Sequence, residues 1–567
     1  MSDRDRDWDF YLRTLSNSTR DSSVATDPAA DPSLLNSVKR LYELCKEEKN
    51  EDLVARVYPH VNKLFQRSVA SLSQSRTSNG LLLLTILQFF LDFGETVLHD
   101  ADPSLRTFFR SCLSREFADP VVAEAALDFL NANKKKLLTS FPTLLPQFFP
   151  LLLKLIAWNG EKLEKAFLKI FPALISPASF LPLLPSLVDL PILIVALEKV
   201  EKSSGSLIGS SIATIQKSTA PEMLLALMDE AYTGSTIADG GGDSESEDSS
   251  TIDAADPLFL ELLKDENDGL AERHWASRGM AATLQAAINA PRSDRLKQIL
   301  NMTPRLLDIY FAITLRDVNN SLICALIPLL MTRNATLFPD KNFSYEIRRR
   351  LLEFMLSSFQ RSPDFIALLK KPIMDRLGEA YDSPAKMELA LQLCWAIGEH
   401  GGGGASHKDA ARELFENLEL LLYENLSSSR LGLRQEATVG SNSENYRKSS
   451  QSRLLCFVLT AIAKLATYHH ELLPRARVSL GKVARSRISD VRVWKRAHDY
   501  LGLMNDPAIS LSILGPSQPS QSVMHPGAVN WSEGRTKMVA HIPFYILGGQ
   551  EGPPFHDFTM SDIRPGK

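Results

Sequence analysis

Apolar residues recur every three or four positions in one segment after another along the chain. This spacing places them on one face of an α-helix, whereas the alternation typical of a half-buried strand is scarce before the C-terminal tail. Residues 408–426 are a clear case, because their apolar side chains share one stripe while the glutamates lie elsewhere. The stripe consists of Ala411, Leu414, Phe415, Leu418, Leu421 and Leu422. The pattern predicts a mostly helical protein whose helices stack on one another.

Capping residues indicate where some of these helices begin and end. Ser383 followed by Pro384 is typical of a helix start, and Gly401 is expected to end that helix. A further helix is predicted over residues 452–473, whose apolar positions again follow the helical period.

Two helices carry a valine, an alanine and a leucine spaced four residues apart and preceded by an aspartate. These are Val122, Ala126 and Leu130 after Asp119-Pro120, and Val493, Ala497 and Leu501 after Asp490. A small residue between two larger ones lets a neighbouring helix approach closely, as in the inner helices of HEAT and armadillo repeats. We therefore predict an all-α fold, a HEAT/armadillo-like α-solenoid of the adaptin trunk type with polar insertions and a short irregular or β-containing tail.

Shifts in composition suggest the boundaries of the parts. The predicted order is a polar N-terminal segment (1–33), an N-terminal solenoid (34–230), an acidic Gly/Ser linker (231–257), a C-terminal solenoid (258–515) with a polar insertion (427–452) that loops out, and a Pro/Gly-rich tail (516–567). Ser244 and Ser250 in the linker each have an acid three positions later, a weak phosphorylation pattern. An unmodified linker is an equal alternative.

The longest apolar stretch, residues 173–197, has the length of a membrane span but contains four prolines and Asp189. Each proline removes a backbone donor and clashes with the preceding turn, so we expect short helices here. The expected protein is soluble and cytoplasmic, with any membrane contact peripheral.

Composition excludes several classes of protein. The chain has 63 Lys and Arg against 67 Asp and Glu, and 44% of its residues are hydrophobic, which argues against wholesale disorder and against a strongly basic nucleic-acid binder. Five cysteines without paired spacing indicate a reducing compartment rather than a zinc site or a disulfide framework. The acidic first ten residues argue against a secretory or transit peptide.

Catalytic motifs are missing from the sequence. Gly481-Lys482 is followed by Val483, so it does not complete a phosphate-binding loop, and no nucleophile elbow, zinc-protease or kinase motif is present. Glu399, His400 and His407 flank a run of glycines and could supply metal ligands, but we interpret them as ordinary exposed residues at a helix end. We expect no enzyme activity, no cofactor and no metal.

A basic run lies near the end of the predicted solenoid. It comprises Arg475, Arg477, Lys482, Arg485, Arg487, Arg492, Lys495 and Arg496, and we expect these cations to face one acid, Asp490. The preferred interpretation is a solvated basic face of consecutive helices. Contact with anionic lipid or an acidic partner is the alternative, and nucleic acid is disfavoured because aromatic residues are not interleaved.

Residues 393–401 read LCWAIGEHG, which is similar to the W-x-x-G-E-[YH]-G element of the large adaptin subunits of vesicle adaptor complexes. Trp395 is expected in the core, and Gly398, next to Glu399, is expected to permit close helix packing. Together with residues 117–138 and 452–466, most of the chain resembles the zeta-subunit family of the fifth adaptor protein complex.

This resemblance implies a noncatalytic large subunit that pairs with beta, medium (mu) and small (sigma) subunits. It further implies clathrin-independent sorting of membrane proteins at late endosomes and lysosomes, with spatacsin and spastizin as associated proteins. No clathrin-box motif is present, since Met228 follows the nearest candidate, Leu224 to Leu227, where an acid is needed. A different α-solenoid scaffold, such as a transport receptor or assembly platform, is the alternative function; an enzyme ranks third.

Overall fold

The computed structural model describes residues 3–20, 32–48, 50–72, 79–203, 208–214, 262–267, 292–401, 407–435, 442–486, 491–506 and 514. These residues form helices joined by turns, and no strand occurs among them, which confirms the prediction of an all-α fold for this part of the chain. They fall into two compact units, unit 1 from Met1 to Leu306 and unit 2 from Leu307 to Lys567. The division lies later in the chain than the linker predicted at 231–257, which is outside the described residues.

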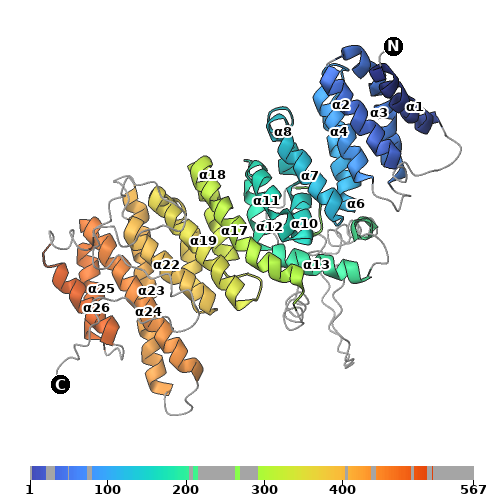
Figure 1. Ribbon diagram of the computed structural model, residues 1–567. Helices are drawn as coiled ribbons and strands as arrows, with labels where there is room; N and C mark the ends of the chain where they lie inside the picture. Colours follow the sequence, from blue (N-terminus) through green and yellow to red (C-terminus); the bar gives the residue numbers. More distant parts are fainter. Residues whose placement is uncertain are drawn as a thin grey trace, which may run out of the picture. The chain divides into compact units, whose positions relative to one another are not determined.

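The helices follow one another closely in both units (Figure 1). Unit 1 contains α1 (Asp3–Arg20), α2 (Pro32–Glu48), α3 (Glu51–Ser71), α4 (Gly80–Phe93), α5 (Ala101–Thr107), the π-helical η2 (Phe108–Leu113), α6 (Ser114–Glu116), α7 (Pro120–Ala132), α8 (Lys134–Ser140), α9 (Leu144–Gln147), α10 (Phe149–Asn159), α11 (Glu161–Ile170), η3 (Phe171–Leu174), α12 (Phe180–Val188) and α13 (Leu190–Ser203). The next described long helix, α17 (Asp294–Asp317), contains the division between the units. Unit 2 continues with α18 (Asn320–Arg333), α19 (Lys341–Arg361), α20 (Asp364–Leu368), α21 (Lys370–Gly378), α22 (Pro384–His400), α23 (Lys408–Gln435), α24 (Asn442–Tyr468), η5 (His470–Leu472), α25 (Leu473–Arg485) and α26 (Val491–Leu503).

α7 and α11 run in the same direction, as equivalent helices of an α-solenoid do. Asn159, just before α11, donates to the carbonyl of Phe117, just before α7, at 2.8 Å. At the other end of the same two helices, Asn131 donates to the carbonyl of Ala166 at 2.9 Å. Both contacts show that α7 and α11 run in the same direction, with α8, α9 and α10 between them in sequence.

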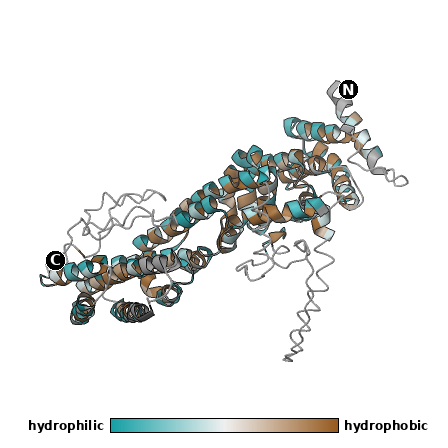
Figure 2. Cartoon of the chain, turned by 90° about the horizontal axis from the view of Figure 1, so that it is seen from below, coloured by the Kyte–Doolittle hydropathy of each residue, from teal (hydrophilic) through white to brown (hydrophobic). Residues whose placement is uncertain are grey.

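The cores lie between the stacked helices. Val122, Ala126 and Leu130 of α7 are each 1% exposed, and the Asp119 carboxylate caps this helix by accepting from the Val121 amide at 2.9 Å. Figure 2 shows hydrophobic residues on the sides of helices that meet neighbours and hydrophilic residues on their outer sides. On α26, Val493 and Ala497 are buried, but Leu501 is only half-buried and Asp490 lies outside the described residues.

The proline-rich apolar stretch forms η3, α12 and α13, as the prolines predicted. α12 and α13 meet at a bend of 66°, and Pro185 is accommodated inside α12. Within the described ranges, no single helix has the length and apolar character needed to cross a membrane, although the bent α12–α13 pair passes by length and composition together.

Two predicted polar segments contain helices. The prediction that residues 427–452 loop out is wrong for the described part, because α23 continues to Gln435 and α24 begins at Asn442. The serine and arginine residues there have only modest helix cost, so two long helices can extend through them. The helix predicted over 452–473 correspondingly starts earlier and ends at Tyr468.

The N-terminal polar segment (1–33) also contains an element that packs. α1 buries Leu15 completely, and Arg56 of α3 lies 5.9 Å from the centre of the Trp8 ring. Trp8, Tyr11 and Leu15 have helical spacing, but the acidic start of the segment obscured the stripe in the sequence. The C-terminal tail (516–567) lies outside the described residues.

Candidate functional site

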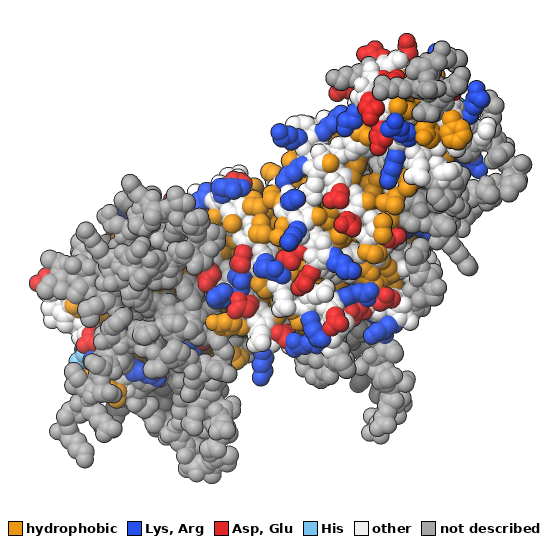
Figure 3. All heavy atoms as spheres, in the orientation of Figure 1, with side chains coloured by type: hydrophobic (Ala, Val, Ile, Leu, Met, Phe, Trp, Pro, Cys, Tyr) orange, Lys and Arg blue, Asp and Glu red, His pale blue; other side chains and the backbone are white. Residues whose placement is uncertain are grey.

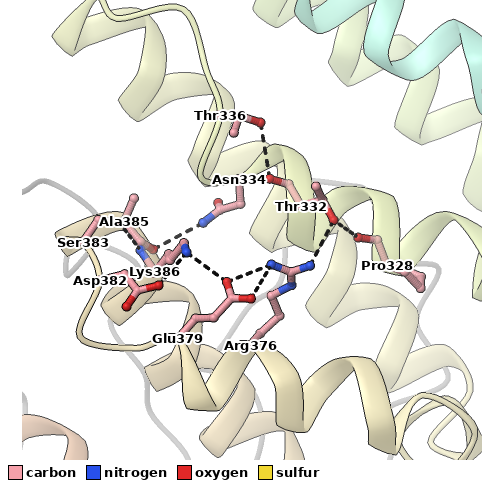
Figure 4. Close-up of polar contacts among 10 residues, drawn as sticks. All are labelled: Pro328, Thr332, Asn334, Thr336, Arg376, Glu379, Asp382, Ser383, Ala385 and Lys386. Carbon is pink, nitrogen blue, oxygen red and sulfur yellow. Dashed lines mark hydrogen bonds and ion pairs between the residues drawn. The ribbon is translucent and has the colours of Figure 1, made fainter. Parts of the chain in front are cut away.

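The adaptin-like motif is carried by α22, whose start is fixed by polar contacts. Ser383 accepts from the Lys386 amide at 3.3 Å, and Pro384 occupies the first turn. The Lys386 ammonium lies 3.0 Å from Glu379 and 2.8 Å from Asp382, just before the helix (Figure 4). These contacts connect the beginning of α22 to the end of α21.

Gly398 lies at a close approach of α22 to α24. A Cβ atom at this position would be 3.0 Å from the Cα of Ala461 and 3.3 Å from the Cδ of Lys464. Because such distances leave no space for a methyl group without movement of a neighbour, the absence of a side chain permits this packing. Trp395, one turn earlier, is 5% exposed and belongs to the core.

Glu399 pairs with Lys464 in the interior between the same helices. The two side chains are 4% and 2% exposed, and the Lys464 ammonium donates to the Glu399 carboxylate. A buried charge is tolerated when it is paired and hydrogen-bonded. Glu399 therefore neutralises a lysine that the alanine-rich face of α24 carries into the core.

A second ion pair joins α22 and α24 eleven residues earlier on each helix. Arg453 lies 2.8 Å from Glu388, whose side chain is 9% exposed. Burial raises the pKa of Glu388 to about 7, although Arg453 and then Arg348 of α19 oppose the shift. The equal spacing of both pairs shows that α22 and α24 run in the same direction, with α23 connecting them.

The prediction that Glu399, His400 and His407 are exposed is wrong, because Glu399 is buried and both histidines are half-buried. Glu399 is buried, and His400 contacts the Trp395 ring edge-on with centres 5.6 Å apart. Loss of water around the His400 imidazole lowers its pKa to about 4. His407 lies 3.0 Å from Asp364 instead, and within the described residues no group of three such ligands could hold a metal ion.

The basic run is spread over α25 and α26, and several of its members have structural partners. Arg475 bridges Glu416 at 2.7 Å and Glu419 at 2.6 Å, both on α23. Burial alone would raise the pKa of Glu419, but hydrogen bonds from Ser479 and Arg475 hold it below its ordinary value. The prediction that Asp490 is the one acid facing this run is therefore wrong, because α23 supplies two more.

Arg496 is buried and belongs to the packing rather than to a surface. Its guanidinium donates to the Cys456 carbonyl at 3.2 Å and to the Thr460 hydroxyl at 3.0 Å, which connects α26 to α24. The Tyr500 hydroxyl lies 2.7 Å from the same Thr460 oxygen. The candidate basic surface therefore does not include Arg496.

The remaining members occupy different environments. Arg477 donates to the Met504 carbonyl, and Arg485 donates to the Gly481 carbonyl of its own helix. Lys482 lies 4.2 Å above the Tyr423 ring. Arg477, Lys482 and Arg485 remain exposed on α25, whereas Arg492 and Lys495 on α26 are half-buried; Arg487 lies outside the described residues.

Mixed charge characterises the visible face of unit 1. Figure 3 shows Lys and Arg side chains interspersed with Asp and Glu over its described helices, with hydrophobic side chains between them. Interspersed charge favours solubility and several weak contacts rather than one strong field of a single sign.

Two models of known families match the chain. A model described as AP-5 complex subunit, vesicle trafficking, matches residues 29–154, and one described as AP-5 complex subunit zeta-1, C-terminal TPR repeats, matches residues 243–532. TPR repeats, like the predicted HEAT or armadillo repeats, stack helical hairpins into a solenoid.

Curated relatives agree with the family models. AP-5 complex subunit zeta-1 of Mus musculus is 24% identical over 452 residues, which cover 76% of this chain and 50% of the relative. The Homo sapiens protein of the same name is also 24% identical over 452 residues, covering 77% of this chain and 50% of the relative. The chain thus spans about half the length of these relatives, and no solved structure matches it. Because one of the models covers more than half of the chain, the chain belongs to the AP-5 complex subunit zeta-1 family.

Proposed function

We propose that this chain is the noncatalytic large subunit of a heterotetrameric vesicle adaptor complex and acts by holding other subunits on its stacked helices. The match to family models near both ends of the chain carries this proposal. The buried ion pairs between α22 and α24 support it, because they align the helices of unit 2 without building a reactive centre.

The partners in this proposal are the beta, medium and small subunits of the fifth adaptor complex, with spatacsin and spastizin as associated proteins. The site of action is the cytoplasmic face of late endosomes and lysosomes, where the complex sorts membrane proteins without clathrin. A different solenoid scaffold, serving as a transport receptor or assembly platform, is the competing function. Ser244 and Ser250 lie outside the described residues, and their phosphorylation stays a prediction.

Purification of the tagged chain from cytosol and membrane fractions tests the proposal. Recovery of a beta, a medium and a small subunit in near-equal amounts supports it. Stoichiometric partners of another kind would favour the competing scaffold function, and recovery of the chain alone would contradict both.

The proposal also includes contact between the exposed cations of α25 and an anionic membrane surface. Arg477, Lys482 and Arg485 would each contribute on the order of 1 kcal/mol near an anionic bilayer at low salt. Replacing all three by glutamine should weaken binding to phosphatidylserine vesicles and flatten its salt dependence. Unchanged vesicle binding would assign these residues to a solvated face.

A further inference from the structure

A short segment of unit 1, Leu262–Asn267, packs against helices of the same unit that lie far from it in sequence. It contacts α9, α10 and η2, which precede it by about a hundred residues or more. Leu262 and Leu263 are 4% and 1% exposed, so the segment buries two adjacent leucines. Burial of such side chains stabilises by about 1.5–3 kcal/mol each, which is the scale of a reversible peptide contact rather than of a whole domain core.

The backbone of the segment pairs with the junction between α9 and α10. The amide of Leu151, in the first turn of α10, donates to the Asp265 carbonyl at 3.3 Å, and the Asn267 amide donates to the Gln147 carbonyl at 2.7 Å. First-turn amides and last-turn carbonyls have no partner within their own helices. The α9–α10 junction therefore offers a donor and an acceptor to an incoming chain.

Charge complementarity gives the contact its chemical character. The Lys154 ammonium lies 2.6 Å from the Asp265 carboxylate and also donates to the Leu263 carbonyl, while the lysine side chain is 1% exposed. Arg110 donates two hydrogen bonds to the Glu266 carboxylate, at 2.5 and 2.9 Å, and Gln147 donates a third at 2.5 Å. The pKa of Glu266 is lowered, chiefly by the hydrogen bond from Arg110 and against the effect of burial.

An empty site would be unfavourable because Lys154 would lose its carboxylate partner while most of its stem stays among apolar side chains. The surface therefore requires an occupant with a carboxylate at the Asp265 position, and preferably two adjacent leucines before it. The Arg110 guanidinium can donate two parallel hydrogen bonds to one carboxylate, which favours a second acidic residue directly after the first.

We propose that Arg110, Gln147, Leu151 and Lys154 form a peptide-binding site that the chain's own residues 262–267 occupy, and that an acidic peptide of a partner protein with two adjacent leucines takes their place. The occupant in the free chain acts as an intramolecular competitor. Tethering gives it an effective concentration that can reach the millimolar range, so peptides in solution bind weakly until it is displaced.

Fluorescence anisotropy with a labelled peptide of residues 258–268 tests the proposal on the full chain. In one release variant, Asp265→Asn and Glu266→Gln weaken the internal contact; in a second, Gly-Ser residues replace 262–267. Both should bind the peptide at least tenfold more tightly than the wild type. A peptide carrying the same Asn and Gln changes should bind neither variant.

Substitutions on the receiving surface complete the test. Arg110→Gln, on a half-exposed side chain, should reduce peptide binding to the second release variant by tenfold or more, and Lys154→Met should abolish it. Circular dichroism establishes that each variant is folded. If the folded second release variant binds no more tightly than the wild type, or if Arg110→Gln leaves its affinity unchanged, residues 262–267 are a fixed part of unit 1 and the proposal is overturned.

Discussion

Glu399 and Lys464 form a buried ion pair one residue beyond the point where Gly398 lets α22 approach α24. The motif that resembles adaptins thus combines a residue without a side chain and a charge with a specific partner. Close approach removes water from Lys464, and Glu399 compensates the charge that has lost its water. The two features depend on each other.

Removing one partner of this pair should be costly. Lys464→Met is expected to lower the free energy of unfolding by about 3–5 kcal/mol, because Glu399 would remain buried without a counter-charge. Denaturant unfolding followed by circular dichroism measures the loss. In the double variant Glu399→Leu with Lys464→Met, apolar packing should recover most of it. A loss in the single variant below about 1 kcal/mol would show that water reaches the pair.

Gly398→Ala tests the close approach itself. The new methyl group would meet Ala461 at 3.0 Å, and we expect a cost of about 1–3 kcal/mol from the forced separation of the helices. Gly502 in α26 is the matched control, since nothing lies within 4 Å of a Cβ atom there. Gly502→Ala should instead stabilise by about 0.5–1 kcal/mol through helix propensity. Equal effects at both positions would refute the packing role.

The raised pKa of Glu388 predicts that acidification stabilises unit 2. Its folded-state pKa of about 7 is above the unfolded value, so the folded state holds its proton more tightly. The stabilisation is full below about pH 4.3, is lost progressively as the pH rises to about 7, and totals on the order of 3 kcal/mol. Unfolding curves from pH 5 to 8 should show Glu388→Gln close to the wild type at the acidic end and more stable at pH 8. Parallel profiles would mean that Arg453 keeps Glu388 ionised throughout.

Two arginines of the basic run should respond in opposite ways to substitution. Arg496→Met removes two interior hydrogen bonds, those to the Cys456 carbonyl and the Thr460 hydroxyl, and we expect a loss of about 2–3 kcal/mol. Arg485→Gln removes only a contact with its own exposed helix and should change stability by less than about 0.5 kcal/mol. Thermal unfolding of both variants at equal protein concentration measures the two effects. An Arg496→Met variant as stable as the wild type would show that Arg496 has no structural role in the packing of α26 on α24.

Local patterns predicted the helices well because the relevant signals lie within one turn of each other. Ser383, Pro384 and Gly401 bound α22 as the capping rules indicate, and the apolar stripe of residues 408–426 is buried except for Leu421, which is half-buried. α1 was missed because the aspartates at its start, Asp3, Asp5, Asp7 and Asp9, give that segment a polar composition.

Long-range partners could not be predicted from one sequence. Glu399 was interpreted as exposed because its counter-charge, Lys464, is 65 positions away. Arg475 was counted as part of an unbalanced basic run for the same reason, since Glu416 and Glu419 belong to α23. The docking of residues 262–267 on α10 carries no periodic signal, and the shift in composition after residue 257 placed them in the C-terminal solenoid instead.

Co-expression of this chain with the beta, medium and small subunits of the fifth adaptor complex from the same organism tests the central claim most directly. The measurement is the mass of the purified assembly by light scattering after size exclusion. Our account predicts a single species containing one copy of each of the four chains. A monomeric chain that elutes apart from an assembly of the other three would contradict it.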